Sequence, residues 1–158
     1  MPRITSDRKA LEEVRSHLGA NMKTRILALL MLVSIAHAGD SVDPVLDRLA
    51  KVDRFAFGGT GFAGVISRGE KDFRIILARP SAEADFEKLL AVGNAQAKAY
   101  ALVGIRGLKP SRFGQISGPL RDSTEEVVTQ RGCIVYHESF RVVLKRIDAG
   151  TYLAYTGR

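Results

Sequence analysis

The sequence predicts a mainly α-helical fold, in which helical hairpins pack as one small domain with a short β-hairpin near the carboxyl end. Three observations predict this class. Apolar residues recur at helical spacing over most of the chain after residue 43, and capping residues precede those segments. One late segment, 124–136, is instead rich in Val, Ile and Thr. The regular alternation of strands and helices that an α/β sheet requires is missing.

Residues 22–38, MKTRILALLMLVSIAHA, are typical of a secretory signal peptide. Two basic residues precede an apolar run over 26–36, which is shorter than the ~20 apolar residues of a membrane-spanning helix. A small-x-small site ends at Ala38, so we expect cleavage between Ala38 and Gly39. The alternative interpretation of the apolar run is a buried core helix. The signal peptide predicts a periplasmic or secreted protein with no stable membrane anchor after cleavage.

This interpretation divides the chain into three segments. Residues 1–21 are either a genuine extension or the result of a start assigned too early, with Met22 as the true initiator. Residues 22–38 are the signal peptide, and residues 39–158 are a single mature helical domain. The whole chain has 24 Lys and Arg against 17 Asp and Glu, a net charge of +7. Residues 39–158 keep 18 basic and 14 acidic residues, or +4, and these are scattered, so no nucleic-acid partner is predicted.

The first two helices of the mature domain have clear start signals. Asp43 suits the cap position of the first helix, and Pro44 suits its first turn. Ser67 and Glu70 fit a capping box for the second helix. Pro80 ends that helix, because the residue before a proline avoids helical geometry.

Three more helices follow before residue 118. Ser81 is the predicted cap of the third helix, and Gly93-Asn94 separates it from a run over 95–108. That run is either a helix or a buried strand over 100–105, and its alanine content and length favour the helix. Residues 81–107 then form an antiparallel helical hairpin, and Pro110 begins a short fifth helix.

Residues 55–64, FAFGGTGFAG, predict an irregular glycine-rich loop that Phe55, Phe57 and Phe62 hold against the core. Residues 59–64 also match the G-x-G-x-x-G pattern of dinucleotide-binding turns. No convincing buried strand precedes the pattern, and the next helix begins too late for it. We therefore expect a packing loop and no cofactor.

Two short strands, over 125–130 and 133–136, are predicted on either side of Arg131-Gly132. A last helix follows from Ser139. Its apolar residues are spaced i, i+3, i+4 and i+7, the cleanest amphipathic pattern in the chain: Phe140, Val143, Leu144 and Ile147. We expect residues 151–158 to fray.

The helix pairs over 67–117 resemble the helical hairpins of HEAT-like repeat proteins, although no clear repeat period is present. The stretches AKAYALVGI and TQRGCIV are similar to small uncharacterised exported bacterial proteins, a resemblance that implies no activity. Helix pairs of this kind offer rigid grooves, so they predict an envelope protein or a peptide as the partner.

Cys133 and His137 are the candidate catalytic residues of a hydrolase, because a thiol needs a base within hydrogen-bond reach. Four residues apart on a strand, they lie about 13 Å apart and meet only where the chain turns between them. The apolar run CIVY predicts that the Cys133 thiol is buried. This single cysteine cannot form an intramolecular disulfide, but it allows a disulfide-linked dimer.

Surface carboxylates are the second catalytic candidate: Glu125, Glu126 and Glu138. Exposed strand and cap positions explain them more simply. His137 is the only histidine after residue 38, so no transition-metal site is predicted. Three aspartates lack the spacing of a calcium-binding loop: Asp40, Asp43 and Asp47.

The function predicted from these observations is that of an exported, non-enzymatic module that binds another macromolecule, without cofactor or metal. The alternative is a cell-envelope hydrolase that uses Cys133 or the surface carboxylates. A purely structural envelope protein is a third interpretation, which the sequence does not separate from the first.

Overall fold

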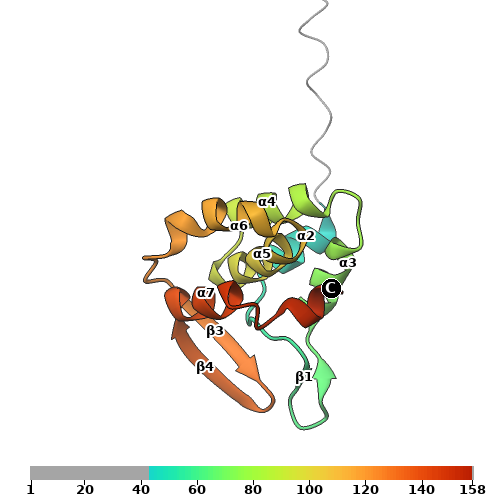
Figure 1. The fold of residues 1–158 in the computed structure, drawn as a ribbon. Helices are drawn as coiled ribbons and strands as arrows, with labels where there is room; N and C mark the ends of the chain where they lie inside the picture. The colour runs from blue at the N-terminus through green and yellow to red at the C-terminus, as the bar shows by residue number, and fades with distance from the viewer. Residues whose placement is uncertain (1–42, 158) are drawn as a thin grey trace, which may run out of the picture. The chain divides into compact units, whose positions relative to one another are not determined.

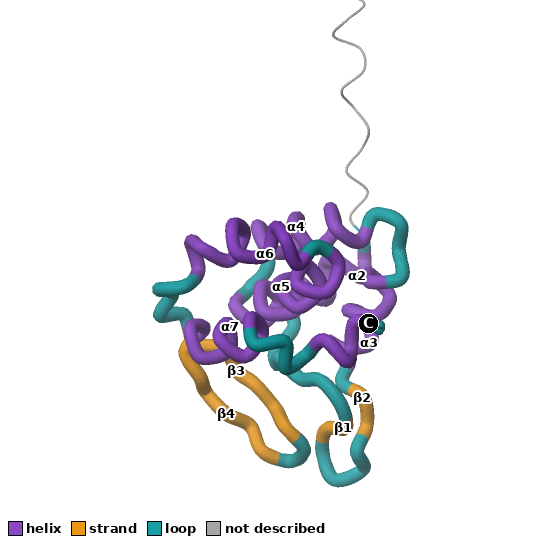
Figure 2. The backbone as a smooth tube through the Cα atoms, in the orientation of Figure 1, coloured by secondary structure: helices purple, strands orange, loops and turns teal. Residues whose placement is uncertain are grey.

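Six α-helices and two short β-hairpins make up residues 43–157, the part of the chain that this computed structural model describes (Figures 1 and 2). The helices are α2 (Pro44–Ala50), α3 (Arg68–Leu77), α4 (Ala82–Val92), α5 (Ala95–Leu108), α6 (Pro110–Ser117) and α7 (Phe140–Asp148). The strands are β1 (Gly59–Thr60), β2 (Val65–Ile66), β3 (Glu126–Arg131) and β4 (Ile134–Ser139), and two 3₁₀ turns are η2 (Gly118–Leu120) and η3 (Leu153–Thr156).

The predicted signal peptide, its cleavage site after Ala38 and the extension over 1–21 lie outside the described residues. Within 43–157, no helix has the length and apolar character needed to cross a membrane. The predicted fold class is confirmed: helical hairpins and a late β-hairpin pack on one core.

Helix α5 lies at the centre of that core, with most of its residues buried against α4, α6, α7, β3 and η3. It pairs with α4 across a turn at Gly93 and Asn94, and the Asn94 side chain accepts a hydrogen bond from the Ala97 N–H at 2.9 Å. The two helices approach closely because residue 104 is glycine. A Cβ there would lie 2.3 Å from the Phe86 ring. The helical interpretation of 95–108 and the predicted hairpin are both confirmed.

The predicted cap residues stand at the N-cap positions of α2, α3 and α4, and two of the three make side-chain capping bonds. The predicted capping box of α3 is half formed, because the Glu70 carboxylate accepts from the Gly58 N–H at 2.7 Å and from Arg74. The Asp43 carboxylate accepts hydrogen bonds from the Val45 and Leu46 N–H groups, and the Ser67 hydroxyl accepts one from the Glu70 N–H at 3.1 Å. Ser81 stands at the N-cap position of α4, but its side chain makes no capping hydrogen bond. Its hydroxyl donates to the Asp85 carboxylate at 2.9 Å and does not accept from a backbone N–H of the first turn.

An aromatic cluster joins the glycine-rich segment to α5 and to the carboxyl end: Phe55, Phe57, Phe73, Tyr100, Tyr152 and Tyr155. The buried Tyr100 hydroxyl accepts from the Ala56 N–H at 2.9 Å and donates to the Ala56 carbonyl at 2.7 Å. Phe57 stacks on Tyr155 with ring centroids 4.8 Å apart. The predicted fraying of residues 151–157 is therefore wrong, because two tyrosines supply apolar surface that the cluster covers.

Strands β3 and β4 form the predicted antiparallel hairpin, displaced by one to three residues from the expected bounds. Gly132 and Cys133 make its two-residue turn, and Gly132 has a φ of +57°, which glycine adopts without strain. Residues 55–61 then run parallel to β3. The Phe55 N–H donates to the Val128 carbonyl at 2.8 Å, and the Gly61 N–H donates to the Gly132 carbonyl at 2.9 Å. This pairing holds the tips of the two hairpins together.

Candidate interaction surface

The tips of the β1–β2 and β3–β4 hairpins lie at the same end of the domain, away from the helices (Figures 1 and 2). They carry five of the eight large hydrophobic side chains that are exposed within residues 43–157: Phe62, Val65, Ile66, Ile134 and Val135. We call these five residues the apolar tip. Phe62 is the extreme case, with an exposure of 103%. Scattered exposed apolar residues are ordinary, but a concentration on two adjoining loops indicates a contact surface.

The turn that carries Phe62 explains why this side chain does not reach the core. Gly61 and Gly64 have φ angles of +70° and +62°, so the chain bends sharply on both sides of Phe62. A Cβ at either glycine would meet nothing within 4 Å, which means that the loop projects into open space. The prediction that Phe62 holds the loop against the core is therefore wrong. Phe55 and Phe57 do so without it.

Charged residues are absent from the apolar tip and present at its margins. Residues 55–67 contain no charged side chain, and Arg54 and Arg68 stand immediately before and after them. Arg131 ends β3 and lies over the Tyr136 ring, 4.4 Å from its centroid. These three arginines therefore flank, in the sequence, the segments that carry the apolar tip.

A polar network around Glu138, behind the second hairpin, holds the Arg131 side chain in place. Glu138 accepts a hydrogen bond from the Thr129 hydroxyl at 2.6 Å and pairs with Arg146 and, at 3.4 Å, with Arg131. Burial acts to raise the pKa of the Glu138 carboxyl, but the hydrogen bond from Thr129 and the pairing with Arg146 together leave that pKa below its usual value. Glu138 is therefore held as a carboxylate that orients its neighbours.

The two candidate catalytic residues are not brought together. Cys133 lies in the hairpin turn and is exposed, so the predicted burial of its thiol is wrong. His137 lies four residues further on, with the continuous strand β4 between them, which places the residues about 13 Å apart. The His137 Nδ1 atom is instead 2.7 Å from the Glu126 Oε1 atom, and both side chains are largely exposed. The thiol therefore has no base from His137.

The candidate carboxylates have separate partners. Glu125 pairs with Lys98 at 3.0 Å, Glu126 with His137, and Glu138 with Arg146. Each of the three carboxylates is therefore engaged by a different basic residue.

The other sequence motifs have structural explanations. The G-x-G-x-x-G residues 59–64 form the turn of the β1–β2 hairpin, and α3 begins only at Arg68, so the glycines do not lead into a helix start. Asp43 caps α2 and pairs with Arg79, and Asp47 pairs with Lys51 at 2.7 Å. Asp40 lies outside the described residues. Among residues 43–157, no three His, Cys, Asp or Glu side chains are grouped to hold a metal ion.

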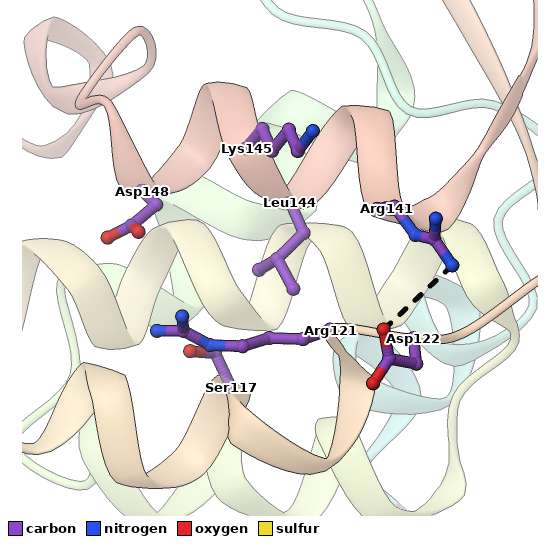
Figure 3. A pocket seen from close by; sticks show the side chains of 7 residues that line it. All are labelled: Ser117, Arg121, Asp122, Arg141, Leu144, Lys145 and Asp148. Atoms are coloured by element: carbon purple, nitrogen blue, oxygen red, sulfur yellow. Dashed lines mark ion pairs between the residues drawn. The ribbon is translucent and has the colours of Figure 1, made fainter.

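A hollow of about 250 Å³ lies between the end of α6 and helix α7 (Figure 3). Its lining mixes both charges around one apolar side chain: Ser117, Arg121, Asp122, Arg141, Leu144, Lys145 and Asp148. Arg141 reaches toward Asp122 at 3.9 Å, and the Lys145 amine points away from Arg121 (Figure 3). The lining therefore offers both cations and anions to a ligand.

Comparison with known proteins adds no family to this description. No family model matches the chain, and neither the curated proteins nor the solved structures contain a significant match. The resemblances to HEAT-like hairpins and to small exported proteins stay predictions.

Sequence reasoning did not identify the apolar tip, because it assigned every phenylalanine of the loop to the core. One signal for it was present. Phe62 stands between Gly61 and Gly64 in the charge-free segment 55–67, within the predicted irregular loop.

Proposed function

We propose that this protein is an exported, non-enzymatic module that acts by binding a component of the cell envelope through its apolar tip. The observation that carries the proposal is the exposure of Phe62 and four further apolar residues on two joined hairpins. The export part of the proposal rests on the signal-peptide pattern of residues 22–38. A contact surface of this kind needs a partner that covers it, since water-exposed apolar area of this concentration favours association.

The apolar tip supports binding better than the surfaces of the helix pairs do. Outside the tip, the large exposed hydrophobic residues of 43–157 stand one each on three different helices: Ile75, Val92 and Val142. Isolated residues of this kind are normal for a protein surface. The contact is therefore proposed at the hairpin end of the domain and not in a helical groove.

A photo-crosslinking amino acid in place of Phe62 tests the proposal in the native host, with the same amino acid in place of Ile75 as the matched control. Ile75 is 48% exposed on α3 and lies outside the tip. We expect a defined adduct from position 62 and none from position 75. Equal labelling at both positions, or none at position 62, would count against the tip as a contact surface.

The export part has its own measurement, the intact mass and amino-terminal sequence of the protein in each cell fraction. We expect a chain that begins at Gly39 outside the cytoplasm. A full-length chain in the cytoplasm would remove export from the proposal and leave the crosslinking result to stand alone.

A further inference from the structure

The apolar tip is a projection and not a groove. The β1–β2 and β3–β4 hairpins extend from the helical body (Figure 1), and the turn around Phe62 has open space on both sides. A rigid protein partner would need a hollow of matching shape to cover such a projection. A fluid lipid interface closes around any small apolar projection, because its acyl chains and headgroups rearrange.

The net charge of the described domain complements an anionic surface. The apolar centre has no charge over residues 55–67, and Arg54, Arg68 and Arg131 flank the segments of the tip in the sequence. Asp53 lies beside Arg54 at 3.5 Å and Glu138 beside Arg131 at 3.4 Å, which offsets two of these cations. Among the described residues, Arg68 forms no ion pair, and it lines a hollow with Arg48, Lys51 and three aspartates: Asp47, Asp53 and Asp72. Residues 43–157 carry 17 basic and 13 acidic side chains. This part of the chain therefore has a net charge of +4, which favours an anionic surface.

The two tips are also fixed relative to each other. The Gly61 N–H donates to the Gly132 carbonyl at 2.9 Å, and residues 60 and 132 form a parallel bridge. Phe62 on one hairpin and Ile134 on the other are thus presented together. A surface that is ordered before binding loses little conformational entropy when it binds.

From these three observations we infer that the apolar tip inserts into the interfacial layer of a lipid bilayer that carries anionic headgroups. Phe62, Val65 and Ile134 enter the boundary between headgroups and acyl chains, and Arg68 contacts the headgroups. The attachment is peripheral and reversible, since a few side chains supply it. This inference rests on the proposed function and names the envelope component that the tip binds.

Vesicle flotation tests the inference with the chain from Gly39 to Arg158, because residues 43–157 contain a complete core of their own. Circular dichroism first checks that this chain is folded. Vesicles of phosphatidylcholine are compared with vesicles that also contain phosphatidylglycerol. We expect binding to the anionic vesicles that weakens as salt is added. Phe62→Ser should lower the partition coefficient on the order of tenfold, and Arg68→Gln should lower it about fivefold.

Two matched controls separate insertion from loss of folding. Ile75→Ser removes an exposed apolar side chain outside the tip and should leave partitioning unchanged. The chain has no tryptophan, so Phe62→Trp introduces a single reporter whose emission should shift to shorter wavelength on anionic vesicles. Ile75→Trp should show no such shift.

Several outcomes would overturn the lipid inference. One is absence of vesicle binding by the folded chain, and another is binding that Phe62→Ser leaves intact. A defined protein adduct at position 62 without vesicle binding would retain the proposed function and replace lipid by a protein partner. Self-association that is lost in Phe62→Ser would instead identify a second copy of this chain as the occupant.

Discussion

Phe55 and Phe62 belong to the same charge-free, glycine-rich segment, yet one is buried and the other fully exposed. Phe55 contacts Phe57, Tyr100 and Tyr152 in the aromatic cluster, and its backbone pairs with β3. Phe62 stands seven residues later on a turn that no other element covers. The two phenylalanines thus show that the two parts of the segment have different roles. Its first part joins the sheet to the helices, and its second part presents an apolar surface to the outside.

The largest expected effect is the difference in stability between truncating these two phenylalanines. Phe55→Ala should lower the free energy of unfolding by about 3–5 kcal/mol, because it leaves a cavity among buried rings. Phe62→Ala should change it by no more than about 0.5 kcal/mol, because the side chain contacts solvent. Urea unfolding followed by circular dichroism measures both. Similar losses in the two variants would mean that the tip is packed against something and that the comparison is wrong.

A smaller effect on the free energy of unfolding is expected from the Tyr100 hydroxyl, which bonds the first part of the glycine-rich segment at Ala56. Tyr100→Phe leaves the buried Ala56 N–H without its partner, while the Ala56 carbonyl keeps the hydrogen bond from the Ser67 hydroxyl at 3.0 Å. The substitution should cost about 1–3 kcal/mol of unfolding free energy. Burial raises the pKa of Tyr100 to about 12, despite hydrogen bonds to Ser67 and Ala56 that act to lower it. The folded-state pKa lies above the unfolded value of 10.0, so this contribution is complete below pH 10 and is lost as pH rises toward 12.

The control for this prediction is Tyr136→Phe, since the Tyr136 ring lies on the exposed hairpin under Arg131. Its unfolding free energy should match that of the wild type within about 0.5 kcal/mol. An alkaline unfolding series should show a loss between pH 10 and 12 in the wild type and a smaller loss in Tyr100→Phe. A series that is identical in the two proteins would show that Tyr100 does not titrate in the folded domain as described.

A still smaller effect on the free energy of unfolding is expected from the ion pairs of the helical body, which the uncharged tip does not have. A hydrogen bond from Arg79 is the largest cause that lowers the pKa of Asp43, from 3.8 to about 2, and the Leu46 and Val45 N–H groups add to it against the effect of burial. A lowered folded pKa means stability that is present above pH 4 and lost as pH falls toward 2. Asp43→Ala should cost about 1 kcal/mol at pH 7 and much less at pH 2, where the carboxyl is protonated in the wild type too.

Urea unfolding at the two pH values measures this difference. Asp122→Ala is the matched control, because Asp122 is almost fully exposed and its nearest cation, Arg141, lies 3.9 Å away. That variant should unfold like the wild type at both pH values. An Asp43→Ala loss of equal size at pH 7 and pH 2 would show that the carboxylate charge does not stabilise α2.

The smallest expected effect concerns the thiol beside the tip. Cys133 is exposed, so iodoacetamide should alkylate it in the folded protein. His137→Ala should change the rate by less than about twofold, since the two residues are separated along β4. Mass spectrometry follows the reaction. Rapid alkylation at pH 6 that disappears in His137→Ala would restore the hydrolase interpretation.

The helices were predictable because their signals are local. Ser67 and Asn94 each bond to an N–H three residues away, a spacing that the sequence displays directly. The two-residue turn Gly93-Asn94 between α4 and α5 likewise leaves few arrangements for the pair. The bounds of the helices over 67–117 and 139–148 therefore follow from local signals.

The missed features depend on partners distant in the sequence. Tyr155 is ordered by Phe57, nearly a hundred residues earlier, so the carboxyl end had no local reason to be structured. The thiol of Cys133 looked buried beside Ile134 and Val135, but all three lie at a turn and an open strand where apolar character does not imply burial. Local patterns identify apolar residues and leave open what covers them.

The pairing of residues 55–61 with β3 also bears on the order in which parts of the domain fold. Arg54 and Gln130, which lie beside each other in this pairing, are 76 positions apart in the chain. Contacts between such distant segments form late, since the loop between them must first be closed at an entropic cost. The helical hairpin over 82–108 lies inside that loop, so its folding shortens the effective distance to be closed. We therefore expect the two halves of the apolar tip to meet after the helices have formed, so that a partly folded chain exposes them as separate loops.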